Sequence, residues 1–407
     1  MVDQRTYDSD FDAILNNRAI LQIIPRLDAG GAEKTTVDIA KALVSASALS
    51  FVMCEGGRLT SELVSNGTTF IQFSAASKNP FRIIINGIKL VQFIRTHHID
   101  IIHARSRAPA WSAWIASKIA KIPFITTYHG SYTGKSKFKI LYNSVMARGD
   151  IIIANSRYTA DHIRKMHPFA DDRIRVVYRG TDMAEFSRDA VAEERIENLR
   201  TQWGIKKDKR IILLAGRLTE LKGQRVLIDA MQILVGRGIT DIVAVLAGDD
   251  QGRISYVAEL DKKIAQLGLG SFVKRVGHCS DMPAAFALAT VVTMPSTQAE
   301  TFGRSAVEAQ ALETPVIVSN LGAVPETVLS PPDCRQEERT GWRVPPNDAK
   351  AMADAMFSAL SLTEIEHAAL VSRARAHVTE HFSLDRMTGD TLKIYNEILS
   401  KKAENQL

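Results

Sequence analysis

The stretch from Val291 to Ser319 constrains the fold of this chain more than any other. It begins with an apolar run, Val291–Met294, and continues through a polar loop into a helical pattern from about Gly303 to Leu312. A second apolar run, Pro315–Ser319, follows directly. Two buried strands joined by a helix form a βαβ unit, which requires a parallel sheet with helices on its faces. The sequence therefore predicts an α/β fold.

The loop and the helix of this unit carry two carboxylates, Glu300 and Glu308. A helix that starts after Gly303 presents backbone N–H groups and the positive end of its dipole, which suits a phosphate. Glu300 comes just before that point, and Glu308 can accept hydrogen bonds from a ribose-like diol. A nucleoside diphosphate joined to a sugar would satisfy all three features. A Glu308 that simply faces solvent explains the spacing as well.

The length and composition set the class of protein. A chain of 407 residues is too long for one ordinary core and indicates two domains. Its 45% hydrophobic and 24% charged residues are typical of a soluble globular protein, and no apolar run has the roughly 18 residues that span a bilayer. The N-terminus is acidic, unlike a signal peptide. Three widely spaced cysteines (Cys54, Cys279, Cys334) indicate reduced thiols, so we expect a cytoplasmic protein.

The net charge of +6 fits nucleic acid, an anionic membrane or phosphorylated small molecules. Scattered basic residues, without an Arg-rich run, zinc-finger spacing or RNP-like segment, argue against nucleic acid. The stripe Phe81, Ile84, Ile88 and Val91 has helical spacing and predicts a core-facing helix, with a surface on anionic lipid as the alternative. Lys135–Lys139 is either a second basic, partly aromatic patch of that surface or a solvated loop. Peripheral contact with the inner face of the cytoplasmic membrane thus stays open.

In the first half of the chain, strand and helix patterns alternate from Ile20–Pro25 onward. Gly30 and Gly31 follow that strand and let the backbone approach a ligand, although a tight structural turn explains them equally well. His129 follows a strand end, where open α/β sheets bind ligands, and is a candidate for chemistry. His103-Ala-Arg105 also ends a strand and could face the same cleft, whereas Asn155-Ser156 is interpreted as a helix cap.

The second half begins after the alternation stops near Asp182. A charged stretch, 190–202, precedes a fresh buried strand, Ile211–Ala215, and the next loop holds Arg217 and Lys222. Both cations flank a helix start and could reach one diphosphate; a pair of surface cations is the alternative. The predicted segments are an extension (1–18), two Rossmann-like domains (19–185 and 186–383) and a terminal helix (384–407) that crosses back to the first domain.

Four motifs occur in a fixed order: Gly30-Gly31, His129-Gly130, Gly216-Arg-Leu-x3-Lys-Gly223 and Glu300-x7-Glu308. Together they resemble the retaining glycosyltransferases of family 4 (glycosyl transferases group 1). The resemblance covers about residues 19–400 and implies the GT-B architecture, two Rossmann-like β/α/β domains facing each other across a deep cleft. Similar segments at 104–109 and 128–132 suggest bacterial lipopolysaccharide or surface-glycan assembly.

The resemblance implies a role for each motif. The enzyme would move a hexose from a nucleotide-sugar donor to a glycan or lipid-linked acceptor, which the first domain would bind. Arg217 and Lys222 would bind the donor's diphosphate and stabilise the charge that develops on it. The remaining implied contacts are Glu300 to the sugar hydroxyls, the backbone of Thr301, Phe302 and Gly303 to phosphate, Glu308 to the ribose, His129 to the transferred sugar, and Gly30 and Gly31 to phosphate and acceptor.

Family members transfer the sugar with retention, the departing phosphate taking the acceptor's proton. No protein base, metal or other cofactor is therefore expected. The Asp-x-Asp matches within Asp8–Asp12 lie in the N-terminal tail and are interpreted as unrelated. Two alternatives remain: a nucleotide-sugar epimerase of the same fold, for which no acid–base pair is evident, and a catalytically silent nucleotide-sugar-binding protein, which would not need all of these motif residues.

Overall fold

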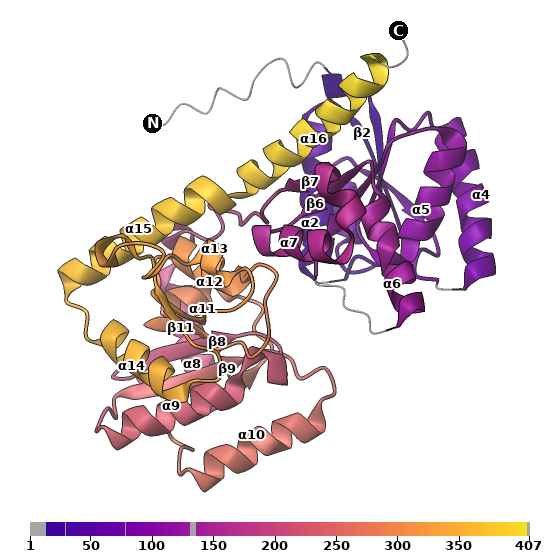
Figure 1. The fold of residues 1–407 in the computed structure, drawn as a ribbon. Helices are drawn as coiled ribbons and strands as arrows, with labels where there is room; N and C mark the ends of the chain where they lie inside the picture. The colour runs from indigo at the N-terminus through magenta and orange to yellow at the C-terminus, as the bar shows by residue number, and fades with distance from the viewer. Residues whose placement is uncertain (1–13, 29, 78, 131–135, 405–407) are drawn as a thin grey trace. The chain divides into compact units, whose positions relative to one another are not determined.

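The computed structural model describes residues 14–28, 30–77, 79–130 and 136–404, which fall into two compact units (Figure 1). Unit 1 contains the chain up to Gly180 together with the C-terminal segment from Leu384. Unit 2 runs from Thr181 to Ser383. The change from one unit to the next thus comes a few residues before the predicted position after residue 185. The Asp-x-Asp matches and most of the predicted extension lie outside the described residues.

Unit 1 is built on a seven-stranded sheet within the described residues, in the order β3-β2-β1-β4-β5-β6-β7. Every pairing in it is parallel. The strands are β1 (Ala19–Ile23), β2 (Leu49–Cys54), β3 (Thr69–Gln72), β4 (Ile101–Ala104), β5 (Phe124–Tyr128), β6 (Ile151–Ala154) and β7 (Ile174–Val176). The central strands β1, β4, β5 and β6 are buried along their whole length, because helices cover both faces of the sheet.

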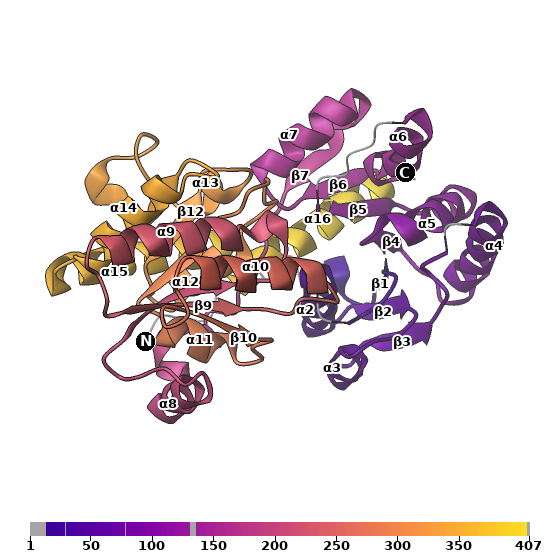
Figure 2. The same ribbon diagram turned by 90° about the horizontal axis from the view of Figure 1, so that it is seen from below.

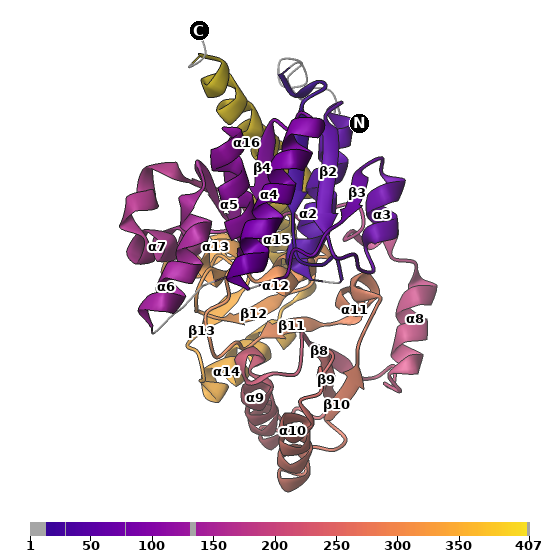
Figure 3. The ribbon, with the colours of Figure 1, turned by 90° about the vertical axis from the view of Figure 1, so that its right-hand side faces the viewer.

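The helices of unit 1 divide between the two faces of its sheet. Helices α4, α5 and α7 pack on one face, and α2 and α16 pack on the other (Figures 1 and 3). The helical segments are α2 (Gly31–Ser45), α3 (Thr60–Ser65), α4 (Pro80–Thr96), α5 (Arg107–Ala120), α6 (Lys137–Asn143), η1 (Ser144–Arg148), α7 (Arg157–Met166), η2 (Pro168–Arg173) and α16 (Leu384–Glu404).

The last helix, α16, is joined to the sheet by buried polar contacts as well as apolar packing. The hydroxyl of Tyr395 lies 2.7 Å from Nδ1 of His103, and Nε2 of His103 lies 2.7 Å from Oγ1 of Thr127. Burial, with the charge of Arg105, lowers the pKa of His103 well below its usual value. His103 is therefore a neutral, hydrogen-bonded core residue, and it holds α16 on the sheet.

Unit 2 is built on a six-stranded sheet in the order β10-β9-β8-β11-β12-β13, again with parallel pairings throughout. Its strands are β8 (Arg210–Ala215), β9 (Ile242–Ala247), β10 (Val273–Gly277), β11 (Val291–Met294), β12 (Val316–Ser319) and β13 (Trp342–Val344). In both units the strand order reverses beside the first strand, between β1 and β4 and between β8 and β11. Open α/β sheets bind ligands at such reversals, beyond the carboxyl ends of the strands.

Helices α9, α10 and α14 cover one face of the unit 2 sheet, and α11, α12 and α15 lie on the other (Figure 2). The helical segments are η3 (Arg188–Ala190), α8 (Glu193–Gln202), η4 (Glu220–Lys222), α9 (Gln224–Gly236), α10 (Ile254–Gln266), α11 (Met282–Leu288), α12 (Arg304–Ala311), α13 (Val324–Thr327), η5 (Gln336–Glu338), α14 (Ala349–Leu360) and α15 (Glu364–Phe382). The α/β fold class with two Rossmann-like halves is confirmed.

The predicted core-facing stripe of α4 is wrong for each of its members except Val91. Its buried residues are Gly87, Leu90, Val91 and Ile94. Phe81, Ile84 and Ile88, expected to face the core, are 78%, 52% and 60% exposed. The predicted residues and the buried residues both recur at helical spacing. The buried side of α4 is the one that packs against α5, because Gly87 allows close approach to Ile115. None of the described helices combines the length and apolar composition needed to cross a bilayer.

Replacing Tyr395 with Phe tests how α16 is held. The change leaves Nδ1 of the buried His103 without its partner, which should cost about 1–3 kcal/mol. We expect hydrogen exchange to quicken in α16 and in β4 and β5, with unit 2 unchanged. Unaltered exchange in these elements would show that apolar packing alone holds the helix.

Candidate functional site

The candidate site of unit 2 lies where the loops after β8 and β11 meet. Lys222 ends the first loop, and Nζ of Lys222 lies 2.6 Å from Oε1 of Glu300 in the second. The hydroxyl of Ser296 donates a hydrogen bond of 2.8 Å to the same oxygen. Both side chains of the ion pair are about one fifth exposed (21% and 23%), so the pair remains accessible to a ligand. Two residues that are far apart in sequence are thus brought together at the strand-order reversal.

Two glycines make this meeting of loops possible. Gly223 has φ +70°, and a Cβ there would overlap the carbonyl oxygen of Pro295. Gly322, after β12, also has φ +70°, and a Cβ there would overlap the backbone of Glu300. The N–H of Ala323 donates to the carbonyl of Glu300 at 2.8 Å. The backbone of Glu300 is therefore held by neighbouring loops while its carboxylate faces Lys222.

Helix α12 begins immediately after this loop. Its N-cap is Gly303, with φ +91°, and no side chain caps the helix. Phe302 is buried and its ring packs edge-on against Phe382, which anchors the turn. The hydroxyl of Ser305 donates to the carbonyl of Ala215 at 3.2 Å and ties the helix start to β8. The start of α12 therefore has no side-chain cap, and phosphate binding by the backbone of Thr301, Phe302 and Gly303 stays a prediction.

Glu308 lies inside α12 and is only 6% exposed, which excludes the solvent-facing alternative. Its Oε1 accepts a hydrogen bond of 2.6 Å from Nε of Arg304. Burial raises the pKa of Glu308, and the charge of Arg304 only partly opposes this. A carboxylate kept in a desolvated position with one partner has acceptor capacity left for a ligand's hydroxyl groups.

Arg217 is placed in the same β8 loop but contacts neither glutamate. Its side chain is exposed and makes no ion pair within the described part of the chain. Its backbone is fixed, because its carbonyl accepts from Nε2 of Gln224 at 3.0 Å and Gln224 in turn accepts from the hydroxyl of Tyr256 at 3.0 Å. Sequence reasoning missed Gln224 and Ser296, since a polar residue inside a helix or loop carries no signal of its partner.

The remaining predicted residues belong to unit 1. Gly30 is the N-cap of α2 with φ −95°, an ordinary extended conformation, so a strained turn does not explain this glycine. A Cβ at Gly30 would instead overlap the carboxylate of Glu33. His129 follows β5, with its Nδ1 3.4 Å from Nη2 of Arg179. Burial and the charges of Arg179 and Arg105 lower the pKa of His129 well below its usual value, so the imidazole is neutral at physiological pH.

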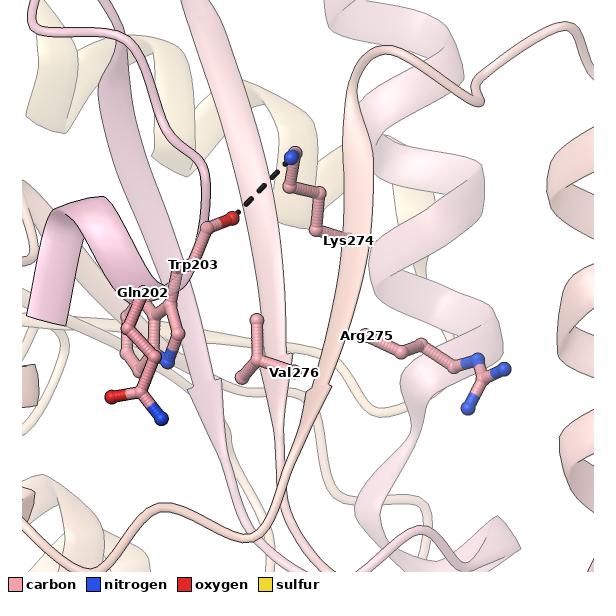
Figure 4. Close-up of a pocket in the computed structure, with 5 residues that line it drawn as sticks. All are labelled: Gln202, Trp203, Lys274, Arg275 and Val276. Atoms are coloured by element: carbon pink, nitrogen blue, oxygen red, sulfur yellow. Dashed lines mark hydrogen bonds between the residues drawn. The ribbon is translucent and has the colours of Figure 1, made fainter.

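A separate hollow of about 390 Å³ in unit 2 involves none of these residues (Figure 4). It is lined by Gln202 and Trp203 at the end of α8 and by Lys274, Arg275 and Val276 of β10. Nζ of Lys274 already donates to the carbonyls of Trp203 and Gly204, at 3.3 and 2.9 Å. These contacts give the lysine a structural task. Within the described ranges, His, Cys, Asp and Glu side chains form no cluster of three or more suited to a metal ion.

Comparison with known proteins identifies the family. Residues 29–185 match the model of Glycosyltransferase Family 4, and residues 195–377 match that of Glycosyl transferases group 1. The crystal structure of a glycosyltransferase from Rickettsia africae is 32% identical, with a TM-score of 0.86 over 94% of this chain and 99% of that one. The chain belongs to the glycosyltransferases of family 4 and group 1.

Two further comparisons place this glycosyltransferase among its relatives. D-inositol 3-phosphate glycosyltransferase from Saccharomonospora viridis is 27% identical over 74% of this chain and 71% of its own length. The Anabaena protein HepE, solved in complex with UDP and glucose, has a TM-score of 0.80 and 24% identity over 94% of this chain and all of that one. The latter likeness is one of fold. The GT-B architecture and the assignment as a transferase are therefore confirmed.

A double-mutant cycle on Lys222→Met and Glu300→Gln measures the ion pair at the loop junction. The pair is partly buried and charge-assisted, so we expect a coupling of about 1–2 kcal/mol in urea unfolding. The exposed pair Lys350–Asp354 serves as the control and should couple by less than about 0.5 kcal/mol. Equal coupling in both pairs would mean that the junction is no more rigid than the surface.

Glu308→Gln should stabilise the ligand-free glycosyltransferase at neutral pH. The folded-state pKa of Glu308 is raised, so folding disfavours its charged form and stability falls as the pH rises through that pKa. The gain should therefore be largest above the folded pKa and vanish below the usual value of 4.5. Melting temperatures of both proteins across this window test the sign, and a variant less stable than wild type at neutral pH would contradict it.

Proposed function

We propose that this glycosyltransferase moves a hexose from a nucleotide diphosphate sugar to a glycan or lipid-linked acceptor with retained anomeric configuration. The observation that carries the proposal is the meeting of Lys222, Glu300 and the uncapped start of α12 at the β8–β11 reversal. A nucleotide sugar presents a diphosphate and sugar hydroxyl groups. The cation and the backbone N–H groups suit the diphosphate, and the carboxylate suits the hydroxyl groups.

The donor is proposed to bind along the loops of unit 2. Its diphosphate would lie at the start of α12 and against Arg217 and Lys222, its sugar hydroxyls on Glu300 and its ribose on Glu308. The ion pair between Lys222 and Glu300 keeps both groups oriented before the donor arrives. Because Lys222 and Glu300 pair with each other, neither charge is uncompensated in the empty site. We propose that both side chains exchange part of this contact for contacts with the donor when it binds.

In the proposed reaction an acceptor hydroxyl attacks the anomeric carbon on the same face of the sugar from which the leaving group departs. The new glycosidic C–O bond forms as the C–O bond to phosphate breaks, and the acceptor's proton passes to the departing phosphate oxygen. Lys222 and Arg217 stabilise the negative charge on the nucleoside diphosphate. Neutral His129 is proposed to contact the transferred sugar, and the backbone at Gly30 and Gly31 to lie near phosphate and acceptor. No metal enters this scheme.

The proposed acceptor class is supported by the names of similar proteins and not by contacts in unit 2. The Saccharomonospora relative is named for a phosphorylated cyclitol, and a fold neighbour at 14% identity, WaaG, for lipopolysaccharide biosynthesis. We propose a surface-glycan or lipopolysaccharide-type acceptor made on the cytoplasmic side. An epimerase or a silent binding protein is disfavoured by the family assignment, and product analysis separates all three.

Peripheral contact with an anionic membrane is proposed from the exposed face of α4 (Figure 3). Phe81, Ile84, Ile85 and Ile88 form a stripe at helical spacing, and each is more than half exposed. The helix carries exposed Arg82, Lys89 and Arg95 and has no acidic residue. An apolar stripe flanked only by cations fits an anionic lipid surface. The patch Lys135–Lys139 lies partly outside the described residues, and its part in this contact is a prediction from sequence.

Lys222→Ala should lower the turnover of the transfer reaction about 30- to 1000-fold and leave the fold intact, because it removes charge stabilisation in the transition state. Release of nucleoside diphosphate from a panel of nucleotide sugars and acceptors measures this. Lys262→Ala, an exposed lysine of α10, is the matched control and should keep full activity. Near-normal turnover of Lys222→Ala would contradict the phosphate role.

Replacing both Phe81 and Ile88 with Ser should weaken binding to phosphatidylglycerol-containing vesicles about tenfold or more. Ile365→Ser, at an 83% exposed position of α15, is the control and should not change it. Sedimentation with vesicles at rising salt separates the apolar and electrostatic parts. Wild-type protein that fails to sediment at low salt would overturn the membrane proposal.

A further inference from the structure

The strand-order reversal of unit 1 contains a buried arginine whose charge is not balanced. Arg105 is the first residue after β4, and its N–H donates to the carbonyl of Ile23 at the end of β1. The residue is 2% exposed. Nevertheless, neither Nε nor Nη2 of Arg105 has a hydrogen-bond partner in the structure, and no ion pair reaches it within the described residues.

A buried guanidinium without a full set of partners lowers the stability of the folded protein. Taking a guanidinium out of water is unfavourable unless an anion and hydrogen-bond acceptors replace the water. The acidic side chain whose charge acts on Arg105 is Asp38 of α2, and that carboxylate is already paired with Nζ of Lys34 at 3.3 Å. Burial accordingly lowers the pKa of Arg105 to about 10, so it remains charged at neutral pH and its compensation is incomplete.

A second buried polar group is unpartnered at the same edge. Asn155, the first residue after β6, is 2% exposed, and neither its Oδ1 nor its Nδ2 has a hydrogen-bond partner among the residues that the structure describes. The strand register shows on which face of the sheet these residues lie, because Ala104 pairs with Thr126 and Tyr128 pairs with Ala154. Arg105, His129 and Asn155 therefore share one face, which is also the face of Ile101, Ile125 and Ile153. Half-buried His129 stands on β5 between the other two.

A second arginine, Arg179, lies at the same edge. The charges of Arg105 and Arg179 both act on His129, and Arg179 donates from Nη2 to the carbonyl of His129 at 3.3 Å. A desolvated guanidinium such as that of Arg105, beside an amide N–H, is the recognition chemistry of an oxyanion, because it supplies directed donors and opposite charge together.

We propose that the carboxyl edge of β4, β5 and β6 is an oxyanion subsite in which Arg105 and Asn155 bind an anionic group, a phosphate or carboxylate, of the acceptor. The assignment to the acceptor rests on the proposed function, in which the donor's diphosphate is bound by unit 2. The subsite makes the acceptor a negatively charged molecule such as a phosphorylated sugar, polyol or lipid. The ligand supplies the charge that the empty site lacks.

The stability of the ligand-free protein distinguishes this role from a structural one. Arg105→Met removes an uncompensated buried charge and keeps the bulk of the side chain, so it should raise the melting temperature by about 2–8 °C. Arg173 of the same unit is the matched control, since its guanidinium donates to the carbonyls of Gly149 and Phe169 at 2.7 and 2.9 Å. Arg173→Met should lower it. A destabilised or unfolded Arg105→Met variant would show that the arginine is structural and overturn the proposal.

Binding of a probe anion supplies the second readout. Millimolar inorganic phosphate or glycerol 3-phosphate should raise the melting temperature of wild-type protein and of Arg173→Met, and the shift should disappear in Arg105→Met and Asn155→Leu. A nucleoside diphosphate should still stabilise Arg105→Met as it does wild type. Loss of nucleoside diphosphate binding with phosphate binding retained would assign Arg105 to the donor and overturn the acceptor assignment. Because none of these measurements needs turnover, failure of the transferase proposal would be seen separately.

Discussion

The close approach of two loops in unit 2 is the contact on which the site depends. Gly223 lies against the carbonyl of Pro295, so the loop after β8 and the loop after β11 touch through their backbones. Any side chain at residue 223 would separate them. Through that contact Lys222 reaches Glu300, and α12 starts beside the end of β8. The strand-order reversal brings these two loops together, and glycine at residue 223 allows their backbones to touch.

Both halves of the protein maintain charges that the empty fold does not fully compensate. Glu308 is buried with one partner, and Arg105 is buried with unpartnered nitrogens. Such groups reduce stability, and cores generally avoid them. They occur here beside the strand-order reversals, on α12 in unit 2 and at the end of β4 in unit 1. Incompletely compensated buried charge near a strand-order reversal is typical of ligand-binding sites.

Much of the fold could be predicted from sequence because parallel strands buried on both faces leave continuous apolar runs. β11 was predicted to the residue, and the start of α12 was placed by Gly303. Short or polar elements escaped prediction: β13 is only three residues long, and α8 lies within a stretch interpreted as a charged connection. Helix α4 shows a different limit, since two apolar stripes with the same period cannot be ranked without their neighbours.

The candidate site was predicted in its residue types but not in its contacts. The motif spacing pointed to Lys222, Glu300 and Glu308, whose roles toward a ligand stay predictions, but it did not indicate that Glu308 pairs with Arg304, four residues away on the same helix. Arg105 was placed at a strand end, but its missing counter-charge is a property of packing and leaves no trace in sequence. Long-range pairing decides such features. The helix cap predicted at Asn155-Ser156 is made by Ser156, whose hydroxyl accepts from Thr159, while Asn155 has no part in it.

Whether Lys222, Glu300 and Glu308 form a donor site can be tested by titrating nucleoside diphosphates and nucleotide sugars into the purified protein and measuring its melting temperature. A ligand that binds only the folded state must raise that temperature. We expect one nucleoside diphosphate to stabilise the wild type, nearly as well alone as with its sugar, and Lys222→Ala to lose most of this shift. If no nucleotide sugar shifts the wild type at millimolar concentration, then Lys222, Glu300 and Glu308 do not form a donor site.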